Sequence, residues 1–251
     1  MDKRPLFVAF STQKGGAGKT TLTVLAASHL HYVKGYNVAI VDCDYPQYSI
    51  ADMRSRDVEQ VMSDIHYKRM AHSLFTQIGK KAYTVVEATP VDAIEKAEQL
   101  KNEEELDFIF FDLPGTLNVA GVIKTLAHMD FVFVPVSADR VVLESTLQFA
   151  TTLHDNLITT GKANIKGLYL IWNMVDGRER TELYQAYDGA IAELGLQTMQ
   201  TVIPDSKRFR REMNAGHKPI FRSTLFPVDK TLLKGSNIEE LVNEFLETVK
   251  S

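Results

Sequence analysis

The sequence has little of several features, and each shortage excludes a class of protein. Cys43 is the only cysteine, so one chain can form no internal disulfide and no cysteine-ligated cluster. No apolar run approaches the roughly 20 residues of a membrane-spanning helix, and the first run is shorter than the core of a secretory signal. The formal net charge of −4 argues against a globally basic nucleic-acid binder, although it leaves room for a local basic patch. We therefore expect a cytoplasmic protein.

Strand-like apolar runs recur along the chain with helical segments between them. Four runs are continuous rather than alternating, as in strands that a parallel sheet buries on both faces: residues 38–41, 108–111, 131–134 and 168–171. Residues 83–86 and 198–203 are weaker strand candidates, and residues 52–105 are polar and mostly helical in pattern. The sequence thus predicts an α/β fold with a doubly wound, mostly parallel sheet flanked by helices, in a single domain over residues 1–251.

The last helix is marked clearly. Ser236 and Glu239, three residues apart, predict a capping box at its start. Apolar residues then fall on one helix face: Ile238, Leu241, Val242, Phe245, Leu246 and Val249. The opposite face is acidic, whereas a membrane-surface helix is usually basic there. We expect this helix to pack on its own sheet and expect no membrane partner.

Residues 13–21 read Gln-Lys-Gly-Gly-Ala-Gly-Lys-Thr-Thr and predict a phosphate-binding loop. The segment lies between an apolar, strand-like run and a helix-compatible segment. Where side chains are absent, successive backbone N–H groups can turn toward an anion, as at Gly15, Gly16 and Gly18. The helix start adds free N–H groups and a positive dipole end. Lys19 is the expected partner of the β- and γ-phosphates, and the Thr20 hydroxyl is the expected partner of Mg²⁺.

The loop departs from the general pattern at one position. That pattern has a glycine five residues before Gly18, and this chain has Gln13 there, with a second lysine, Lys14, beside it. A solvated loop charge is the plain interpretation of Lys14. The glycine-rich surroundings and the missing first glycine favour a functional role instead.

Aspartates follow two of the predicted strands. Asp42 and Asp44 follow one, and Asp112, with Pro114 and Gly115, follows the other. Because the carboxyl ends of parallel strands meet at one edge of the sheet, these residues are expected to converge on the loop. We expect Asp112 to hold Mg²⁺ through water and Asp44 to orient the attacking water. Each aspartate has a helix cap or turn as its alternative role, and Pro114-Gly115 is expected to form a turn that senses the γ-phosphate or else an ordinary loop.

The base is predicted from one absence and two loop segments. The guanine-specific Asn-Lys-x-Asp element does not occur, which favours ATP. Asn173 and Pro204-Asp205 each follow an apolar run and are placed to meet an adenine edge. Taken singly, each is as well explained as a loop-forming residue.

Together these segments resemble the ParA/MinD family of ATPases. Lys14-Gly15-Gly16-Ala17-Gly18-Lys19-Thr20-Thr21 matches the family's deviant phosphate loop. Asp42-x-Asp44 with Pro46-Gln47, and Asp112-x-Pro114-Gly115, are similar to its two switch segments. Val134-Pro135-Val136 and Ile203-Pro204 also resemble this family. The resemblance spans nearly the whole chain. It implies a phosphate-loop NTPase of the SIMIBI type that uses ATP and Mg²⁺, with nucleotide contacts from Gly15, Gly16, Ala17, Gly18, Lys19, Thr20, Thr21, Asn173, Pro204 and Asp205.

The resemblance also implies an ATP-dependent sandwich homodimer. In it Lys14 crosses to the partner's phosphates, while Lys19 acts in its own subunit. ATP hydrolysis is then slow and stimulated by a partner protein. The family usually has Asp-Pro-Gln in the first switch, and this chain inserts Tyr45 after Asp44. Asp42 is therefore expected to share the role of Asp44 through Mg²⁺-bound water, with Thr20 and Asp112 as the other metal-holding residues.

Absences exclude several branches of the family. One cysteine is too few for iron–sulfur relatives, the acidic last helix is unlike that of MinD-like proteins, and no tyrosine follows Tyr187, unlike the tails of bacterial tyrosine kinases. What remains resembles short ParA proteins of DNA partition, including those encoded with conjugative transfer systems. In these proteins, late basic residues hold nonspecific DNA through its phosphates. Such contacts are expected here at Lys207, Arg208, Arg210, Arg211, Lys218 and Arg222.

A solvated face that pairs with acidic residues, including Glu212, is the alternative for this basic segment, and Phe209 within it is expected to pack inward. Three functions stay open. The first is an ATP-driven switch for partition or conjugative transfer of DNA, which binds nonspecific double-stranded DNA as a dimer, associates with the nucleoid and is released by a ParB-like or other DNA-bound activator. The second is a positioning adaptor that binds ATP and barely hydrolyses it, which the Tyr45 insertion allows. The third is a ligase of the dethiobiotin-synthetase type, in which Lys14 has no role in trans.

Overall fold

The structure is a computed structural model that describes residues 4–178 and 181–250. Within them, a seven-stranded sheet has the order β3-β2-β4-β1-β5-β6-β7, and every strand pair in it is parallel. The strands are β1 (Leu6–Phe10), β2 (Val38–Asp42), β3 (Thr84–Glu87), β4 (Phe108–Asp112), β5 (Phe131–Val136), β6 (Gly167–Trp172) and β7 (Gln197–Thr198). From β1 the chain forms β2 and β3 on one side, returns to place β4 between β2 and β1, and then crosses to β5, β6 and β7 on the other side. Because the chain winds in both directions from β1, this order confirms the predicted doubly wound α/β fold.

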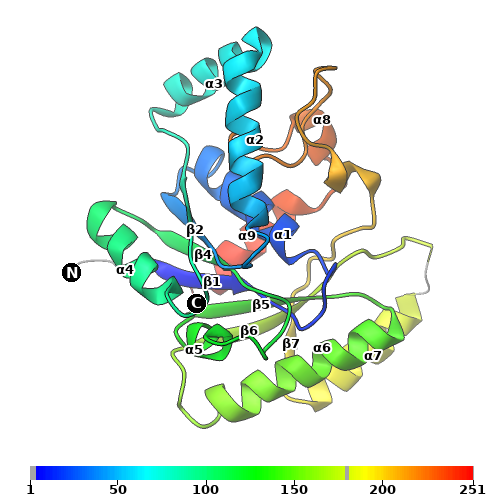
Figure 1. The fold of residues 1–251 in the computed structure, drawn as a ribbon. Helices are drawn as coiled ribbons and strands as arrows, with labels where there is room; N and C mark the ends of the chain where they lie inside the picture. Colours follow the sequence, from blue (N-terminus) through cyan, green and yellow to red (C-terminus); the bar gives the residue numbers. More distant parts are fainter. Residues whose placement is uncertain (1–3, 179–180, 251) are drawn as a thin grey trace.

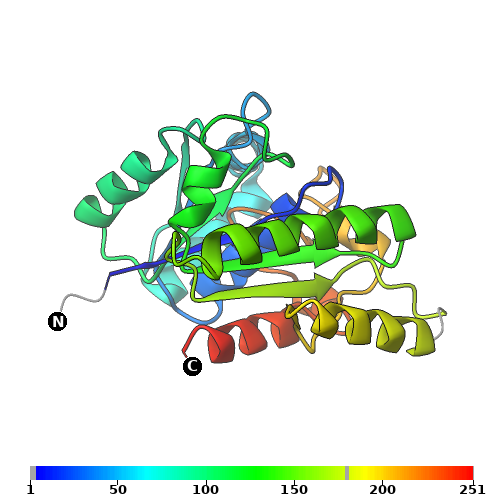
Figure 2. The ribbon, with the colours of Figure 1, turned by 90° about the horizontal axis from the view of Figure 1, so that it is seen from below.

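Helices cover both faces of this sheet (Figures 1 and 2). They are α1 (Lys19–Tyr32), α2 (Ser49–Ser63), α3 (Ile65–Ile78), α4 (Ala93–Glu103), α5 (Val122–Ala127), α6 (Arg140–Leu153), α7 (Thr181–Glu193), α8 (Lys230–Leu233) and α9 (Ile238–Thr248), with a π-helical turn at His154–Ile158 and a 3₁₀ turn at Lys207–Arg210. Helices α1 and α9 share one apolar core with the sheet, while α4, α5 and α6 share the core on the other face. Helices α2 and α3 extend away from the sheet in Figure 1.

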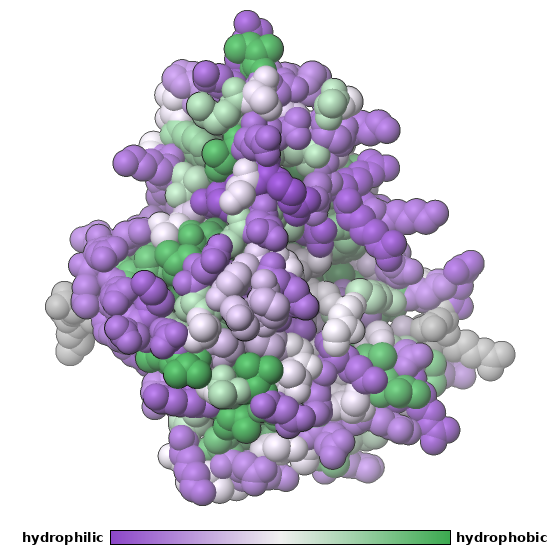
Figure 3. Space-filling view, in the orientation of Figure 1, coloured by the Kyte–Doolittle hydropathy of each residue, from purple (hydrophilic) through white to green (hydrophobic). Residues whose placement is uncertain are grey.

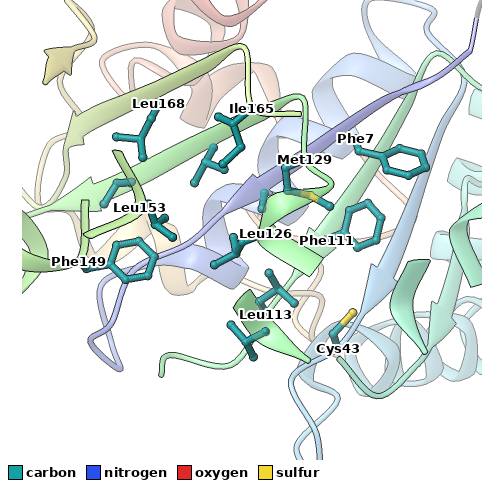
Figure 4. Packing of buried hydrophobic residues seen from close by; sticks show 14 of the residues in the cluster. Phe7, Cys43, Phe111, Leu113, Leu126, Met129, Phe149, Leu153, Ile165 and Leu168 are labelled. Carbon is teal, nitrogen blue, oxygen red and sulfur yellow. The ribbon is translucent and has the colours of Figure 1, made fainter. Parts of the chain in front are cut away.

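The core explains why the central strands are apolar at nearly every position. Strands β2, β4 and β5 are buried along their whole length. In Figure 4 the rings of Phe7 and Phe111, whose centroids are 5.3 Å apart, lie beside Met129, and Cys43 belongs to the same apolar layer. Burial raises the pKa of the Cys43 thiol well above its usual range, so this cysteine is a packed core residue rather than a reactive one.

Helix α9 packs on the sheet as predicted. Phe245 places its ring 5.3 to 6.0 Å from the rings of Phe108, Phe110 and Phe133. Its acidic face also has a structural contact, because the Glu244 carboxylate accepts hydrogen bonds from the backbone N–H groups after β7. In the part of the chain that the structure describes, no helix has the length and apolar character needed to cross a membrane.

Two local predictions are wrong. The strand predicted over 198–203 ends at Thr198. The N–H of Met199 still donates to the carbonyl of Leu170 on β6, but those of Gln200 and Thr201 donate to Glu244, at 2.6 and 2.8 Å, instead of to a strand. The capping box of Ser236 and Glu239 is not formed. Both the N–H and the hydroxyl of Ser236 donate to the carbonyl of Leu233, and α9 begins after Asn237, which adopts a left-handed conformation.

Candidate functional site

The loop between β1 and α1 borders a cavity of about 600 Å³ at the carboxyl edge of the sheet. Gly18, which precedes α1, has a φ of 91°, a conformation that favours glycine. A Cβ there would lie 2.4 Å from Nδ2 of Asn173, and that amide nitrogen donates 2.8 Å to the carbonyl of Ala17. Asn173 therefore fastens the loop to the end of β6, and only glycine fits at position 18.

Asp112 lies at the end of β4 directly beside the loop. Oγ1 of Thr20 donates 2.7 Å to Oδ2 of Asp112. The carboxyl group is fully buried, and its Oδ1 has no hydrogen-bond partner among the described residues. Burial raises the pKa of Asp112 to about 7. An unsatisfied carboxylate oxygen next to a phosphate loop fits a divalent cation.

The residues present therefore fit Mg²⁺, with Thr20 and Asp112 as the groups that would hold it. Among residues 4–178 and 181–250, no group of three or more histidine, cysteine, aspartate or glutamate side chains could hold a metal ion alone. Mg²⁺ usually keeps several waters and shares phosphate oxygens with one or two protein carboxylates. When bound, the ion would neutralise charge on those phosphates.

Asp42 and Asp44, the two aspartates that follow β2, lie in different surroundings. Oδ2 of Asp42 accepts hydrogen bonds from the N–H groups of Ile50 and Ala51, at 2.8 and 3.0 Å, and this buried carboxylate thus caps the start of α2. The helix-cap alternative is confirmed for Asp42, while its action through Mg²⁺-bound water stays a prediction. Asp44 is half-buried and lines the cavity, and its pKa is raised by burial and lowered less strongly by Lys19.

The inserted residue is accommodated outside the cavity. The Tyr45 side chain is 60% exposed, and its ring meets that of Tyr48 edge-on at 5.8 Å. Because Asp44 still lines the cavity with Gln47, the insertion does not remove the candidate catalytic carboxylate from the site.

The two lysines of the loop are placed differently. Lys19 is 8% exposed and lines the cavity. Lys14 is half-buried and is not among the residues that line it. Gly115 approaches both: a Cβ there would lie 3.1 Å from Nζ of Lys19 and 3.4 Å from the carbonyl carbon of Lys14. The turn after β4 therefore lies close to the charged end of Lys19, while its role as a sensor of the γ-phosphate stays a prediction.

Two paired segments form another part of the cavity lining. The N–H of Val175 donates to the carbonyl of Ile203, and the N–H of Asp205 donates to that of Val175, each at 2.9 Å. These bonds bring together the two segments predicted to meet a base. The lining there consists of Asn173, Met174, Pro204, Asp205, Ser206 and Phe209. Met174, Ser206 and Phe209 were not expected here, and their sequence surroundings give no signal for it.

The six residues predicted to contact DNA differ in exposure and in their partners within the chain. Lys207, Arg210, Arg211 and Lys218 are exposed, and Figure 3 shows hydrophilic side chains projecting where Figure 1 draws the chain between β7 and α8. Arg208 instead donates 3.0 and 2.7 Å to the carbonyls of Leu232 and Lys234.

Arg222 lines the cavity and pairs with Glu212. Pairing within the chain, the alternative for this segment, is therefore what the structure shows for Arg222, while Arg208 is fixed by backbone carbonyls. Phe209 packs inward on Phe221, as predicted, with ring centroids 4.7 Å apart.

Sequence reasoning missed one structural residue, Asp57 on α2. Its Oδ2 accepts three hydrogen bonds of 2.7 to 2.9 Å from the hydroxyl of Ser223 and from the N–H and hydroxyl of Thr224. The signal was present, because Asp57 shares the buried face of α2 with Ile50 and Met53. A carboxylate on a buried helix face needs hydrogen-bond donors.

A phosphate loop between a parallel strand and a helix, with a buried aspartate on its threonine, defines a phosphate-loop nucleotide-binding protein. Residues 8–220 match the model of the CobQ/CobB/MinD/ParA nucleotide binding domain, and the chain belongs to this family.

Individual relatives agree with this assignment. The chain is 26% identical, over 224 residues, to the chromosome-partitioning ATPase Soj of Thermus thermophilus, a match that covers 83% of this chain and 85% of that protein. A plasmid partition protein of Borrelia burgdorferi bound to AMPPNP has a TM-score of 0.64 at 15% identity and covers 98% of this chain and 100% of its own. The cell division ATPase MinD of Pyrococcus furiosus has a TM-score of 0.61 at 19% identity, and the match covers 99% of this chain and 100% of the MinD chain. The two structural likenesses show a shared fold.

Proposed function

We propose that this protein is an ATPase that dimerises when it binds ATP and acts in the partition or conjugative transfer of DNA. The observation that carries the proposal is the placement of the two loop lysines, since Lys19 lines the cavity and Lys14 does not. A lysine in a phosphate loop that does not line the loop's own cavity suits a second subunit. The chromosome-partitioning and plasmid-partition relatives support a role in DNA segregation.

The chemistry follows from the residues around the cavity. The loop N–H groups and Lys19 bind and orient the phosphates, and Thr20 with Asp112 would hold Mg²⁺. Asp44, half-buried in the cavity lining, orients the attacking water. Because Tyr45 points outward and leaves Asp44 in place, hydrolysis is favoured over an adaptor that only binds ATP. A DNA-bound activator protein would stimulate this slow reaction.

The DNA partner in this proposal is nonspecific double-stranded DNA, held by exposed cations near the cavity. Lys207, Arg210, Arg211 and Lys218 are exposed, and Arg210 also lines the cavity. A basic segment that borders the nucleotide cavity can change its position when nucleotide binds. DNA affinity would then depend on ATP, and the protein would associate with the nucleoid.

The decisive experiment measures DNA retention with ATP, with ADP and without nucleotide across a salt series. We expect retention with ATP only, decreasing as the salt concentration rises. Lack of ATP-dependent retention even at low salt would contradict the partition role.

A second experiment measures the molar mass in solution for two loop variants. Lys14→Ala is expected to bind nucleotide and stay monomeric with ATP, whereas Lys19→Ala is expected to lose nucleotide affinity itself. A Lys14→Ala variant that dimerises normally with ATP would show that Lys14 does not act in trans.

A further inference from the structure

Arg222 reaches the nucleotide cavity from a distant part of the chain and contacts the first turn of α1. Its Nη1 donates 2.7 Å to Oγ1 of Thr21, a residue 201 positions earlier. Thr21 follows the threonine that contacts Asp112, and both threonines and Arg222 line the cavity. The Arg222 side chain is 23% exposed, so it is shielded from bulk water yet open to the cavity.

Glu212 holds the Arg222 guanidinium in a fixed orientation. Its Nε and Nη2 donate 3.1 and 2.5 Å to Oε1 of Glu212. The backbone at Arg222 is also held, because its N–H donates to the carbonyl of Arg211 and the next two residues bond to Asp57. A guanidinium has five N–H donors, and the bonds to Glu212 and Thr21 use three of them. Two donors remain for a ligand.

The charges around Arg222 favour an anion. Glu212 is shared, since its Oε2 also accepts 3.1 Å from Nη1 of Arg56 on α2. One carboxylate therefore lies between two guanidinium groups, and the cluster has a net positive charge. Planar guanidinium groups with fixed donors are suited to phosphate oxygens.

We propose that Arg222 is a phosphate-binding residue of the nucleotide site and that it binds the phosphate nearest the nucleoside. The residues around the cavity fall into two groups. Lys19, Gly115 and the Thr20–Asp112 pair are assigned to the terminal phosphate and the metal. Phe209 and the paired segments with Asn173 and Pro204 are assigned to the base. Arg222 is linked to both groups, because it donates to Thr21, the neighbour of Thr20, and directly follows Phe221, the packing partner of Phe209.

This inference rests on the proposed function in so far as the cavity must bind a nucleoside polyphosphate. It replaces the interpretation of Arg222 as a DNA contact, because its guanidinium faces the cavity and is bonded to Thr21 and Glu212. A contact to the first phosphate is made equally by ADP and ATP. Arg222 therefore contributes to nucleotide affinity and not to discrimination between the two nucleotides.

The test compares ADP and ATP affinity by calorimetric titration in wild type, Arg222→Gln and Glu212→Gln. Loss of a charge-assisted hydrogen bond to phosphate is expected to weaken both affinities roughly tenfold in Arg222→Gln, with the ratio of the two unchanged. Glu212→Gln keeps Arg222 and removes the competing carboxylate, so its affinities should equal or exceed those of wild type. Arg222→Lys keeps the positive charge but lacks the planar set of guanidinium donors, so its nucleotide affinities should lie between those of Arg222→Gln and wild type.

The outcomes separate the inference from its basis. If wild type binds neither nucleotide, the proposed function fails and the inference fails with it. If wild type binds and Arg222→Gln binds equally well, only the inference fails. An equal loss of nucleotide affinity in Arg222→Gln and Glu212→Gln would show that the pair only stabilises the local structure, which also overturns the inference. Should Arg222→Gln fail to fold, the comparison of Arg222→Lys with Glu212→Gln decides in the same way.

Discussion

The Thr20 hydroxyl lies 2.7 Å from Oδ2 of Asp112 and joins the phosphate loop to the end of β4. The other oxygen of that buried carboxyl group has no partner among the described residues. A buried acceptor without a donor costs free energy of folding, and a metal ion at this position would remove the cost. Function and stability are therefore opposed at Asp112.

Asp112→Asn is expected to separate these two properties. Loss of the carboxylate should lower the affinity for Mg²⁺ in the nucleotide complex by about 10- to 100-fold, as for other residues that support a metal site. The free energy of unfolding without nucleotide should stay the same or rise, because a neutral amide is less costly to bury than a carboxylate with one oxygen left without a donor. ADP titrations with and without Mg²⁺, and urea unfolding, measure the two effects. A variant with unchanged Mg²⁺ dependence would exclude Asp112 from the metal site.

Gly115→Ala is expected to impair ATP hydrolysis with little effect on folding. The new Cβ would lie 3.1 Å from Nζ of Lys19, so the flexible end of that lysine must shift by a few tenths of an ångström. Gly189→Ala, at an exposed position inside α7 with nothing within 4 Å of its Cβ, is the matched control. It should keep full activity and gain up to about 1 kcal/mol of stability from helix propensity. Equal hydrolysis rates in both variants would show that the contact with Lys19 is not needed.

Much of the fold and the loop could be predicted because the signals are local. Strands β2, β4 and β5 are buried at every residue, so their apolar runs are continuous. The phosphate loop depends on neighbouring glycines, and Asp112 follows directly from its strand. Sequence patterns of this kind predict where the backbone can adopt a special conformation and which face of a strand or helix is buried.

The remaining contacts depend on the tertiary structure. Arg222 looks like the other cations of its segment in the sequence, and only the folded chain brings it to Thr21. Glu244 belongs to the polar face of an amphipathic helix, yet it binds the N–H groups that would have continued β7. Side-chain partners more than 40 positions apart leave no periodic trace in the sequence.

DNA binding should depend on the exposed cations and not on Arg208. Lys207→Ala and Arg211→Ala are each expected to reduce the slope of log affinity against log salt concentration by about one, the value for one phosphate contact. Lys96→Ala, an exposed change on α4, should leave the slope unchanged. Arg208→Ala should mainly destabilise the fold, because its guanidinium bonds to the carbonyls of Leu232 and Lys234. Unchanged slopes in the first two variants would place the DNA surface elsewhere.

His29 on α1 is expected to make stability fall at acid pH. The side chain is 1% exposed, and neither ring nitrogen has a hydrogen-bond partner among the described residues. Burial, with a smaller effect of Lys34, lowers the pKa of His29 from 6.5 to about 4. Between those pH values the unfolded chain binds a proton that the folded chain does not, so stability is complete above pH 6.5 and is lost as the pH falls toward 4.

The shift corresponds to about 3 kcal/mol of unfolding free energy between pH 7 and pH 4. His31 also makes stability fall at acid pH, because burial lowers its pKa as well. Wild type and the variant compared below both keep His31. His29→Leu removes the titrating group while it keeps an apolar side chain in the core position. Urea unfolding at pH 7 and at pH 4.5 should therefore show a smaller loss of stability in His29→Leu than in wild type. Parallel losses in the two proteins would mean that His29 is solvated or paired in the folded state.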